Sequence, residues 1–442
     1  MKAHLSSQER TRTDYLFPFV TMVVLMALIG FITSINQQFQ APIKAAFLQS
    51  AGHLNNALAT LLNFAFFLAY LLMGPVSARY LDRNGYKKTI VFGLVLLAFG
   101  VAFFELSALQ FEYLPLSPLV LSSSVSIPLS YFIFLIGSFV CGAGLTYMQS
   151  SVNPYVIACD VRGTSGVQRQ NIAGTFNSTM TAVGPLFVSF LVFRGAEVAD
   201  LKISSILLPL CILFAAILLL SALVSRLQLP HIEGTTAFES KPLTRSVWSF
   251  RHLTLGVVAI FTYVGVEVCV GANINHYAMD DLGYSLTEAA SLASIYWFFM
   301  LIGRLMGSFL SRVNARVLLA VSTSLAIVLM ISFYLLGASS FSLNVGVMEI
   351  KITLNLIGLI LTGLCHSVMW GAIFALATDG LGHYTARGTG ALMMGVVGGA
   401  VLPFLQGVLA DVIGGWHYTW IIILLGEFYM LYYALSGSRV KE

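Results

Sequence analysis

The sequence predicts an all-α membrane protein of twelve transmembrane helices in two six-helix bundles, with both ends of the chain in the cytoplasm. Three observations predict this fold: an apolar composition, twelve apolar stretches of membrane-spanning length, and a one-sided distribution of basic residues. Of the 442 residues, 58% are hydrophobic and 10% are charged, whereas soluble domains carry about 25% charged residues. The composition therefore argues against a soluble globular enzyme, and the length suffices for about twelve crossings of roughly 20 residues each.

The apolar stretches define the expected domains. They lie at residues 15–38, 55–78, 89–109, 129–157, 171–193, 203–225, 252–275, 289–310, 316–338, 350–378, 388–410 and 416–436. The longest polar stretch between them, residues 226–250, divides them six and six. We therefore expect an N-terminal bundle over residues 1–225, a cytoplasmic linker over residues 226–250 and a C-terminal bundle over residues 251–442. The first stretch is too long for a signal peptide, so we expect it to be retained as a helix.

Basic residues gather on one side of the predicted membrane. With both ends of the chain inside, 19 of the 23 Lys and Arg residues fall in cytoplasmic segments; the exceptions are Lys44, Arg194, Lys202 and Lys351. Cytoplasmic loops of membrane proteins carry such an excess. An odd number of helices would destroy the asymmetry, so it supports both the helix count and the orientation. The pattern suits a multi-pass protein of a bacterial inner (plasma) membrane.

Matched residues in the two halves indicate an internal repeat. The second helix of each half is followed by Arg83 and by Arg312, respectively. The fifth helices are bracketed by Arg169 and Pro185 in one half and by Arg387 and Pro403 in the other, at a common offset. Parallel halves with a site between them at the midplane are one architecture of secondary transporters. Chance likeness between apolar helices is the alternative.

Several motifs resemble those of known transporters. The D-R-x-G-x-K-K of residues 82–88 resembles the loop signature of the major facilitator superfamily. More specific segments resemble its fucose, galactose and glucose permease family: Asn153-Pro154-Tyr155, the run from Gly174 to Ser178, AIFTYVGVEVCVG (259–271), IGRLMG (302–307) and GGAVLPFLQGVLAD (398–411). The resemblance covers nearly all of the predicted helices in order. It implies the major facilitator fold and transport of a sugar.

Two departures from that family bear on energy coupling. Proton-coupled members typically carry an Asn-Asp pair on helix 1 and a Glu before the Asn-Pro of helix 4. The corresponding positions here are Asn36-Gln37, with Gln38 as the alternative for the first acid, and Gln149. An amide keeps the hydrogen-bonding shape of a carboxyl group but does not titrate. The usual proton-binding pair is therefore expected to be missing.

Amides within the predicted helices are the main candidates for substrate binding. A neutral sugar presents hydroxyls that donate and accept hydrogen bonds, so its site should contain amides and aromatic rings and little net charge. Gln149 and Asn153 lie one turn apart and share a helix face. The candidates are Asn36, Gln37, Gln38, Asn63, Gln149, Asn153, Asn177, Tyr263, Glu267, Asn273, His366 and Trp370. The alternative for each amide is a hydrogen bond that joins packed helices.

Three of these candidates have more than one interpretation. Glu267, with Tyr263 one turn before it, is a sugar ligand, a cation or proton site, or a structural acid. His366 is a hydrogen-bonding group or a proton relay. Trp370 stacks on the apolar face of a pyranose or packs between helices. Glu427 on helix 12 is expected to pack against a neighbouring helix.

Charged residues in the loops are candidates for a gate. Asp82 can pair with basic residues or with the N-terminus of a neighbouring helix and so hold the cytoplasmic side closed. The expected participants are Asp82, Arg83, Lys87, Arg304 and Arg312. The alternative is that these charges only enforce topology.

The favoured function is a permease that moves a small neutral sugar, a hexose or 6-deoxyhexose, by alternating access and uniport. The alternatives are a sodium- or proton-coupled symporter that uses Glu267, and a multidrug exporter on the same fold. No motif of a membrane enzyme or nucleotide-binding loop occurs, so no catalytic activity is expected. We expect no cofactor or metal, no nucleic-acid partner, a lipid bilayer as the surroundings, and a monomer.

Overall fold

The computed structural model describes residues 15–122, 125–159, 161, 164, 166–194, 202–227, 229, 246–309, 313–336, 339–345, 348–381 and 384–440. Within these ranges, twelve helical segments are long and apolar enough to cross a membrane. Their order and approximate positions agree with the twelve predicted stretches. The linker expected at residues 226–250 falls largely outside the described residues, so the predicted domain boundaries stay predictions.

Six of the twelve spans precede the linker. The helices are α2 (Leu16–Gln38), α3 (Gln40–Phe47), α4 (Asn55–Tyr113), α5 (Leu129–Ala158), α6 (Gly166–Leu186) and α7 (Leu207–Arg226), with shorter turns at η1 (Gly52–Leu54), η2 (Phe187–Val192) and η4 (Ile203–Ile206). The first span comprises α2 and α3 together, and α4 contains the second and third spans. The first span is thus longer than the predicted 15–38.

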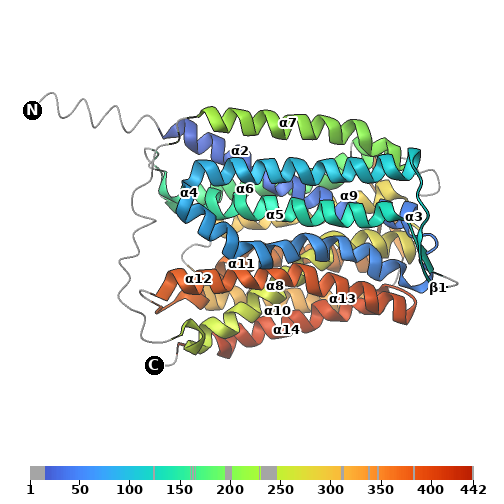
Figure 1. Ribbon diagram of the computed structural model, residues 1–442. Coiled ribbons are helices and arrows are strands. Elements are labelled where there is room, and N and C mark those ends of the chain that lie inside the picture. Colours follow the sequence, from blue (N-terminus) through green and yellow to red (C-terminus); the bar gives the residue numbers. More distant parts are fainter. Residues whose placement is uncertain are drawn as a thin grey trace, which may run out of the picture.

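The other six spans follow the linker. They are formed by α8 (Arg251–Asp280), α9 (Leu286–Phe309), α10 (Ala315–Leu335), α11 (Leu354–Thr378), α12 with α13 (Thr385–Met394, Gly398–Ile413) and α14 (Ile421–Tyr432). Short turns lie at η5 (Val247–Ser249), η7 (Gly395–Val397), η8 (His417–Trp420) and η9 (Tyr433–Gly437). Figure 1 shows these helices lying beside those of the first half with similar tilt.

Two hairpins of β-strands were not predicted. β1 (Leu119–Ser122) pairs antiparallel with β2 (Val125–Ile127), and β3 (Ser340–Val345) pairs antiparallel with β4 (Met348–Thr353). Each hairpin joins the third and fourth spans of its half. The expectation that residues 350–353 begin a helix is wrong, because these residues belong to β4 and α11 starts only at Leu354. Alternating side chains such as those of Ile350 and Ile352 fit a strand as well as a helix end.

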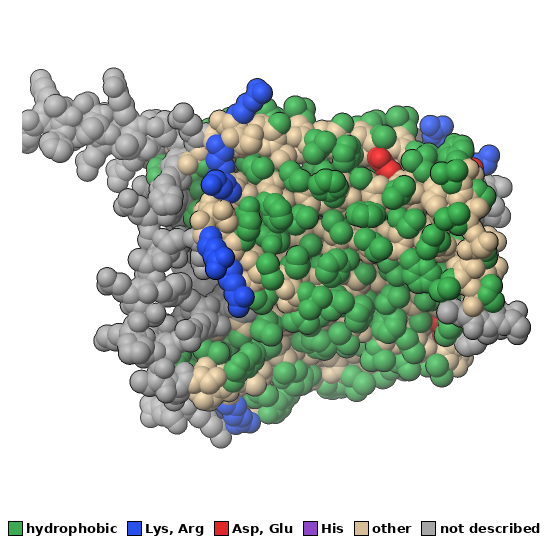
Figure 2. All heavy atoms as spheres, in the orientation of Figure 1, with side chains coloured by type: hydrophobic (Ala, Val, Ile, Leu, Met, Phe, Trp, Pro, Cys, Tyr) green, Lys and Arg blue, Asp and Glu red, His purple; other side chains and the backbone are tan. Residues whose placement is uncertain are grey.

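The helices share one long axis, so the molecule has two ends. The beginning of the first span and the end of the last span lie at one of them, called here the terminal end, and β1 lies at the other, the far end (Figure 1). Lys and Arg side chains gather at the terminal end, whereas the surface between the two ends is mainly hydrophobic (Figure 2). An apolar belt between charged ends is the surface that a lipid bilayer requires.

Gly85 makes the sharp turn between the second and third spans. Its backbone has φ 74° and ψ 172° inside α4. Residues with a side chain rarely adopt this conformation, so the glycine of the D-R-x-G-x-K-K motif is needed for the chain to reverse within so short a connection. The side chain of Asp82 in the same motif lies outside the described part of the structure.

Pro42 explains the interruption of the first span. Helix α2 ends at Gln38 and α3 resumes at Gln40. Proline has no N–H group, so the carbonyl oxygen of Gln38 lacks the donor that would normally stand four residues later. The backbone is therefore broken beside the three glutamines Gln37, Gln38 and Gln40. All three side chains are buried.

Candidate substrate site between the two halves

At the far end, ion pairing and hydrogen bonds join the two halves. Lys44 of α3 forms an ion pair with Asp280 at the end of α8, and its Nζ also donates to Asn56 Oδ1 at 2.6 Å. Asp411 of α13 accepts hydrogen bonds from the backbone N–H groups of Asn56 (3.1 Å) and Ala57 (2.7 Å). A carboxylate at the N-terminus of a helix is favoured by the helix dipole and by the free N–H groups. We name these contacts the far-end latch.

Close backbone packing accompanies the latch. Gly407 of α13 faces Thr60 and the carbonyl of Asn56 on α4 so closely that no side chain could be accommodated. Thr60 is completely buried there. The two halves are therefore in direct contact at the far end, and movement of a substrate past this end requires the contact to open.

Substitution of Asp411 by Leu is expected to loosen the far end. The change removes both carboxylate oxygens that accept hydrogen bonds from the N-terminus of α4. Each hydrogen bond contributes about 1 kcal/mol net, so the ratio of closed to open protein should fall roughly tenfold or more. The measurement is the rate at which an impermeant maleimide, added on the far side, labels a Thr60→Cys reporter in a Cys211→Ser background, because Cys211 is exposed. Asp411→Asn, which keeps one acceptor, should give a smaller increase. Equal labelling of all three proteins would contradict the latch.

Within its membrane spans, the C-terminal half presents a carboxyl group, a guanidinium and two aromatic rings. Glu267 of α8 is half-buried and interacts electrostatically with Arg304 of α9. The hydroxyl of Tyr263, one turn before Glu267, is buried and has no hydrogen-bond partner within the described part of the chain. The half-buried ring of Trp370 on α11 lies 6.2 Å from that of Tyr263, measured between ring centroids. This wall of the site therefore offers one carboxyl group, one guanidinium and two aromatic rings.

Arg304 also reaches the other half. One of its Nη atoms donates a hydrogen bond to the Oγ of Ser178 on α6. Sequence reasoning assigned Arg304 to a loop gate, but it lies inside the membrane-spanning part of α9 and is half-buried. It thus belongs to the interface between the halves. The signal that could have shown this is an arginine followed by apolar residues within a long apolar run.

The N-terminal half contributes amides and a tyrosine. Gln149 of α5 donates from Nε2 to the hydroxyl of Tyr70 on α4 at 2.9 Å. Gln149, Asn153 and Tyr70 are all half-buried. Tyr70 stacks on Phe67, and Phe67 lies close to Gly399 of α13 in the other half. We call Tyr70, Gln149, Asn153, Glu267, Arg304 and Trp370, with Tyr263, the central polar cluster.

Four other amide candidates lie in contacts within one half. Asn177 donates to the carbonyl of Met26 at 2.8 Å, and Asn273 donates to Gln406 Oε1 at 2.9 Å. Asn36 bonds with Asn63 and accepts from Ser138 at 2.6 Å. In this conformation these amides join helices, as the alternative interpretation held. Their roles as substrate ligands stay predictions.

His366 is also held inside one half. Its side chain is fully buried, with Nδ1 2.9 Å from the hydroxyl of Tyr296 and Nε2 2.8 Å from Glu427 Oε1. Both ring nitrogens are therefore engaged, and the imidazole cannot contact a substrate in this state. The expectation that Glu427 packs against a neighbouring helix is confirmed. The sequence showed His366 and Trp370 on one stripe of α11, but it could not show that Glu427 approaches His366.

The expected loop gate is only partly described. Arg83 is exposed and Lys87 is half-buried. Asp82 and Arg312 have no described side-chain position, so the predicted gate stays a prediction. The latch that the structure does describe is at the far end, and it contains Lys44, one of the four basic residues that departed from the charge asymmetry.

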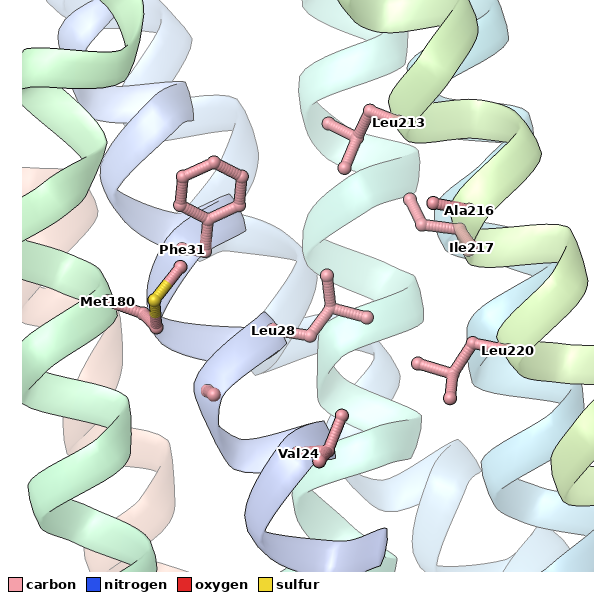
Figure 3. Close-up of a pocket in the computed structure, with 9 residues that line it drawn as sticks. Val24, Leu28, Phe31, Met180, Leu213, Ala216, Ile217 and Leu220 are labelled. Carbon is pink, nitrogen blue, oxygen red and sulfur yellow. The ribbon is translucent and has the colours of Figure 1, made fainter.

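A groove between α2, α6 and α7 has the wrong chemistry for a polar substrate. It encloses about 240 Å³, and the residues that line it are Val24, Ala27, Leu28, Phe31, Met180, Leu213, Ala216, Ile217 and Leu220. Figure 3 shows their side chains converging from the three helices without a polar atom among them. Such a groove offers nothing to the hydroxyl groups of a sugar.

Comparison with known proteins decides the family. The Major Facilitator Superfamily pattern matches residues 26–396, which is most of the chain. The chain belongs to this superfamily. It is a multi-pass protein of the inner membrane, and the predicted fold of twelve helices in two six-helix bundles is confirmed.

Individual superfamily members are similar over long stretches. A glucose/galactose transporter of Brucella abortus is 30% identical over 98% of this chain and 97% of its own length. An L-fucose-proton symporter of Escherichia coli is 26% identical over 65% of this chain and 67% of its own.

Two solved structures share the fold. The E. coli fucose:proton symporter FucP is 22% identical with a TM-score of 0.64, over 95% of this chain and 98% of the other. The E. coli xylose transporter XylE in its inward-open conformation is 12% identical with a TM-score of 0.67, over 97% of each chain.

Proposed function

We propose that this superfamily member carries a small neutral sugar, a hexose or 6-deoxyhexose, across the inner membrane by alternating access. The observation that carries the proposal is the central polar cluster. Half-buried amide, phenol and indole groups lie within the membrane spans of both halves, together with a carboxyl group and a guanidinium that interact electrostatically. Polar groups at this depth are costly unless they serve a pathway or find partners.

The chemistry of the cluster suits carbohydrate better than other cargo. Gln149 and Asn153 can each donate to and accept from hydroxyl groups, and Trp370 offers an aromatic face to the apolar side of a pyranose. The names of the Brucella glucose/galactose transporter and the E. coli fucose symporter point to the same substrate class. A multidrug exporter would instead need a wide apolar and aromatic chamber. The mixed amides and charges of the cluster count against it.

We further propose uniport with the cytoplasm at the terminal end. The positions of the usual proton-binding acids hold Gln37 or Gln38 and Gln149, which do not titrate. Glu267 stands beside Arg304, so a charge on its carboxyl group has a partner within the same half. The rival is proton or sodium symport through Glu267, supported by the name of the fucose-proton symporter. On this proposal, the closed far-end latch lies between the central polar cluster and the outside of the cell.

Uptake into proteoliposomes tests both parts of the proposal. D-glucose, D-galactose and L-fucose serve as the panel, first in counterflow, in which unlabelled internal sugar drives entry of labelled sugar. Counterflow of at least one sugar is expected, and no counterflow with the whole panel would reject the sugar carrier. For a uniporter, labelled sugar then equilibrates but does not accumulate under an imposed proton or sodium gradient. Accumulation under either gradient would reject uniport.

Replacement of Gln149 by Glu should introduce a pH dependence. The new carboxyl group would stand beside Tyr70 at mid-membrane depth, where burial disfavours the charged form. We expect the wild-type uptake rate to vary little between pH 5.5 and 8, and the variant to lose activity several-fold as pH rises and the carboxyl ionises. Gln149→Asn is the control, because it keeps an amide. A flat profile for the Glu variant would contradict the amide argument.

A further inference from the structure

A second group of amides lies between the central polar cluster and the far end. Gln37, Gln38 and Gln40 flank the break that Pro42 imposes on the first span, and Asn275 faces them from α8. Trp297 of α9 lies against Gly271 so closely that a side chain at residue 271 would collide with its ring. We name Gln37, Gln38, Gln40, Asn275 and Trp297 the outer amide cluster. Gly271, which Trp297 contacts, lies one helical turn, about 6 Å along α8, beyond Glu267.

The outer amide cluster bridges the two halves through Gln38. The Nε2 of Gln38 donates to the carbonyl of Gly271 at 3.2 Å, and Asn275 donates to Gln38 Oε1. These bonds use one carboxamide as donor and acceptor at once. They must break when the halves separate at the far end, because Gln38 lies on α2 and its partners lie on α8.

Several polar atoms of this cluster have no partner in the closed conformation. Among the described residues they include Gln37 Oε1, Gln40 Oε1, Asn275 Oδ1 and Trp297 Nε1. All four side chains are more than nine-tenths buried. Leaving a buried donor or acceptor unpaired costs free energy. Three buried acceptors and one buried donor on helices that contact one another are therefore available to a ligand that both donates and accepts.

We propose that the outer amide cluster is a second sugar subsite, filled when the halves open at the far end. The inference rests on the proposed function. Its ligand is a neutral polyhydroxyl compound, because the cluster holds carboxamides and an indole but no charge. Toward the far end, Lys44 and Asp280 are paired with each other. When empty, the cluster closes on itself through Gln38; when filled, hydroxyl groups replace those bonds and satisfy the unpaired atoms.

The first test removes an unpaired atom without removing a bond between the halves. Gln40→Leu deletes the unpaired Oε1, and Trp297→Phe deletes the unpaired Nε1 but keeps an aromatic ring. Each should raise the KM for sugar supplied on the far side about fivefold, the loss of one hydrogen bond of about 1 kcal/mol. The sugar used is the member of the D-glucose, D-galactose and L-fucose panel that the wild type carries.

Gln406→Leu is the matched control. Gln406 is an equally buried glutamine, but it bonds to Asn273 and Thr419 within one half. Its loss should lower the melting temperature and leave the KM within twofold. If Gln40→Leu and Trp297→Phe both keep the wild-type KM within twofold, the subsite is overturned while the sugar carrier stands. If the wild type carries none of the three sugars, the proposed function itself has failed.

A labelling experiment tests the second subsite even if Gln40→Leu and Trp297→Phe fold poorly. Asn275→Cys is placed in a Cys211→Ser background, because Cys211 is the exposed cysteine among the five and the other four are buried. Sugar should slow the reaction of residue 275 with an impermeant maleimide added on the far side. Thr60→Cys, at the contact between α4 and α13, reports closure of the far end alone. Equal slowing at both positions, or none at position 275, would overturn the subsite.

Discussion

Replacing Arg304 with Gln should reduce sugar uptake about 10- to 100-fold. The guanidinium donates to Ser178 across the interface between the halves and compensates the charge of Glu267. Hydrogen bonds to charged groups contribute about 1.5–3 kcal/mol, and each 1.4 kcal/mol is a factor of ten. The measurement is kcat/KM for uptake into proteoliposomes, corrected for the amount of protein inserted.

Two further variants separate the charge of Arg304 from its shape. Arg304→Lys keeps the positive charge but loses the planar fork of donors, so it should retain more activity than the Gln variant. Arg304→Gln combined with Glu267→Gln removes both charges and should recover the protein yield, because no uncompensated carboxylate is then left within the membrane. Wild-type kcat/KM in Arg304→Gln would contradict the assignment of this residue to the substrate site.

Replacing Glu427 with Leu should destabilise the C-terminal half by about 3 kcal/mol. Glu427 and His366 are both completely buried, and their contact is 2.8 Å long. Removing one partner of a buried pair leaves the other without compensation, at a cost of about 3–5 kcal/mol. The measurement is thermal unfolding of the purified protein in detergent. An unchanged melting temperature would contradict a structural role for the pair.

Glu427→Gln tests whether the hydrogen bond alone suffices. An amide oxygen can still accept from the imidazole, so this variant should melt much closer to the wild type than the Leu variant does. Its sugar KM should stay the same, because His366 does not reach the central polar cluster in this conformation. A Gln variant as unstable as the Leu variant would show that the charge of Glu427 matters more than its hydrogen bond.

The fold was predictable because the bilayer constrains it strongly. Apolar runs of fixed length reveal helices whatever their partners, and the charge asymmetry gives their number. The hairpins were missed because short alternating segments at the membrane surface give weaker signals than helices do. The end of the first span was placed too early because lysine and proline interrupt its apolar pattern, although Lys44 is paired there and Pro42 only breaks the helix locally.

The site was only partly predictable. Residue type identified Gln149, Glu267 and Trp370 as candidates, and all three are half-buried within membrane spans. The same reasoning could not separate them from Asn177 and His366, because the same polar residue types occur in contacts between helices and in substrate sites. That distinction depends on which helix stands opposite, a relation between distant segments that no local pattern encodes.

The far-end latch has a kinetic consequence. An unloaded carrier that turns to the outside must break the contacts of Lys44 and Asp411 with nothing to replace them. A loaded carrier gains compensation from the cargo it holds. Return of the vacant protein to the outward-facing state should therefore be the slow step of net flux. One-for-one exchange of internal for external sugar should then run faster than net uptake into vesicles that contain no sugar.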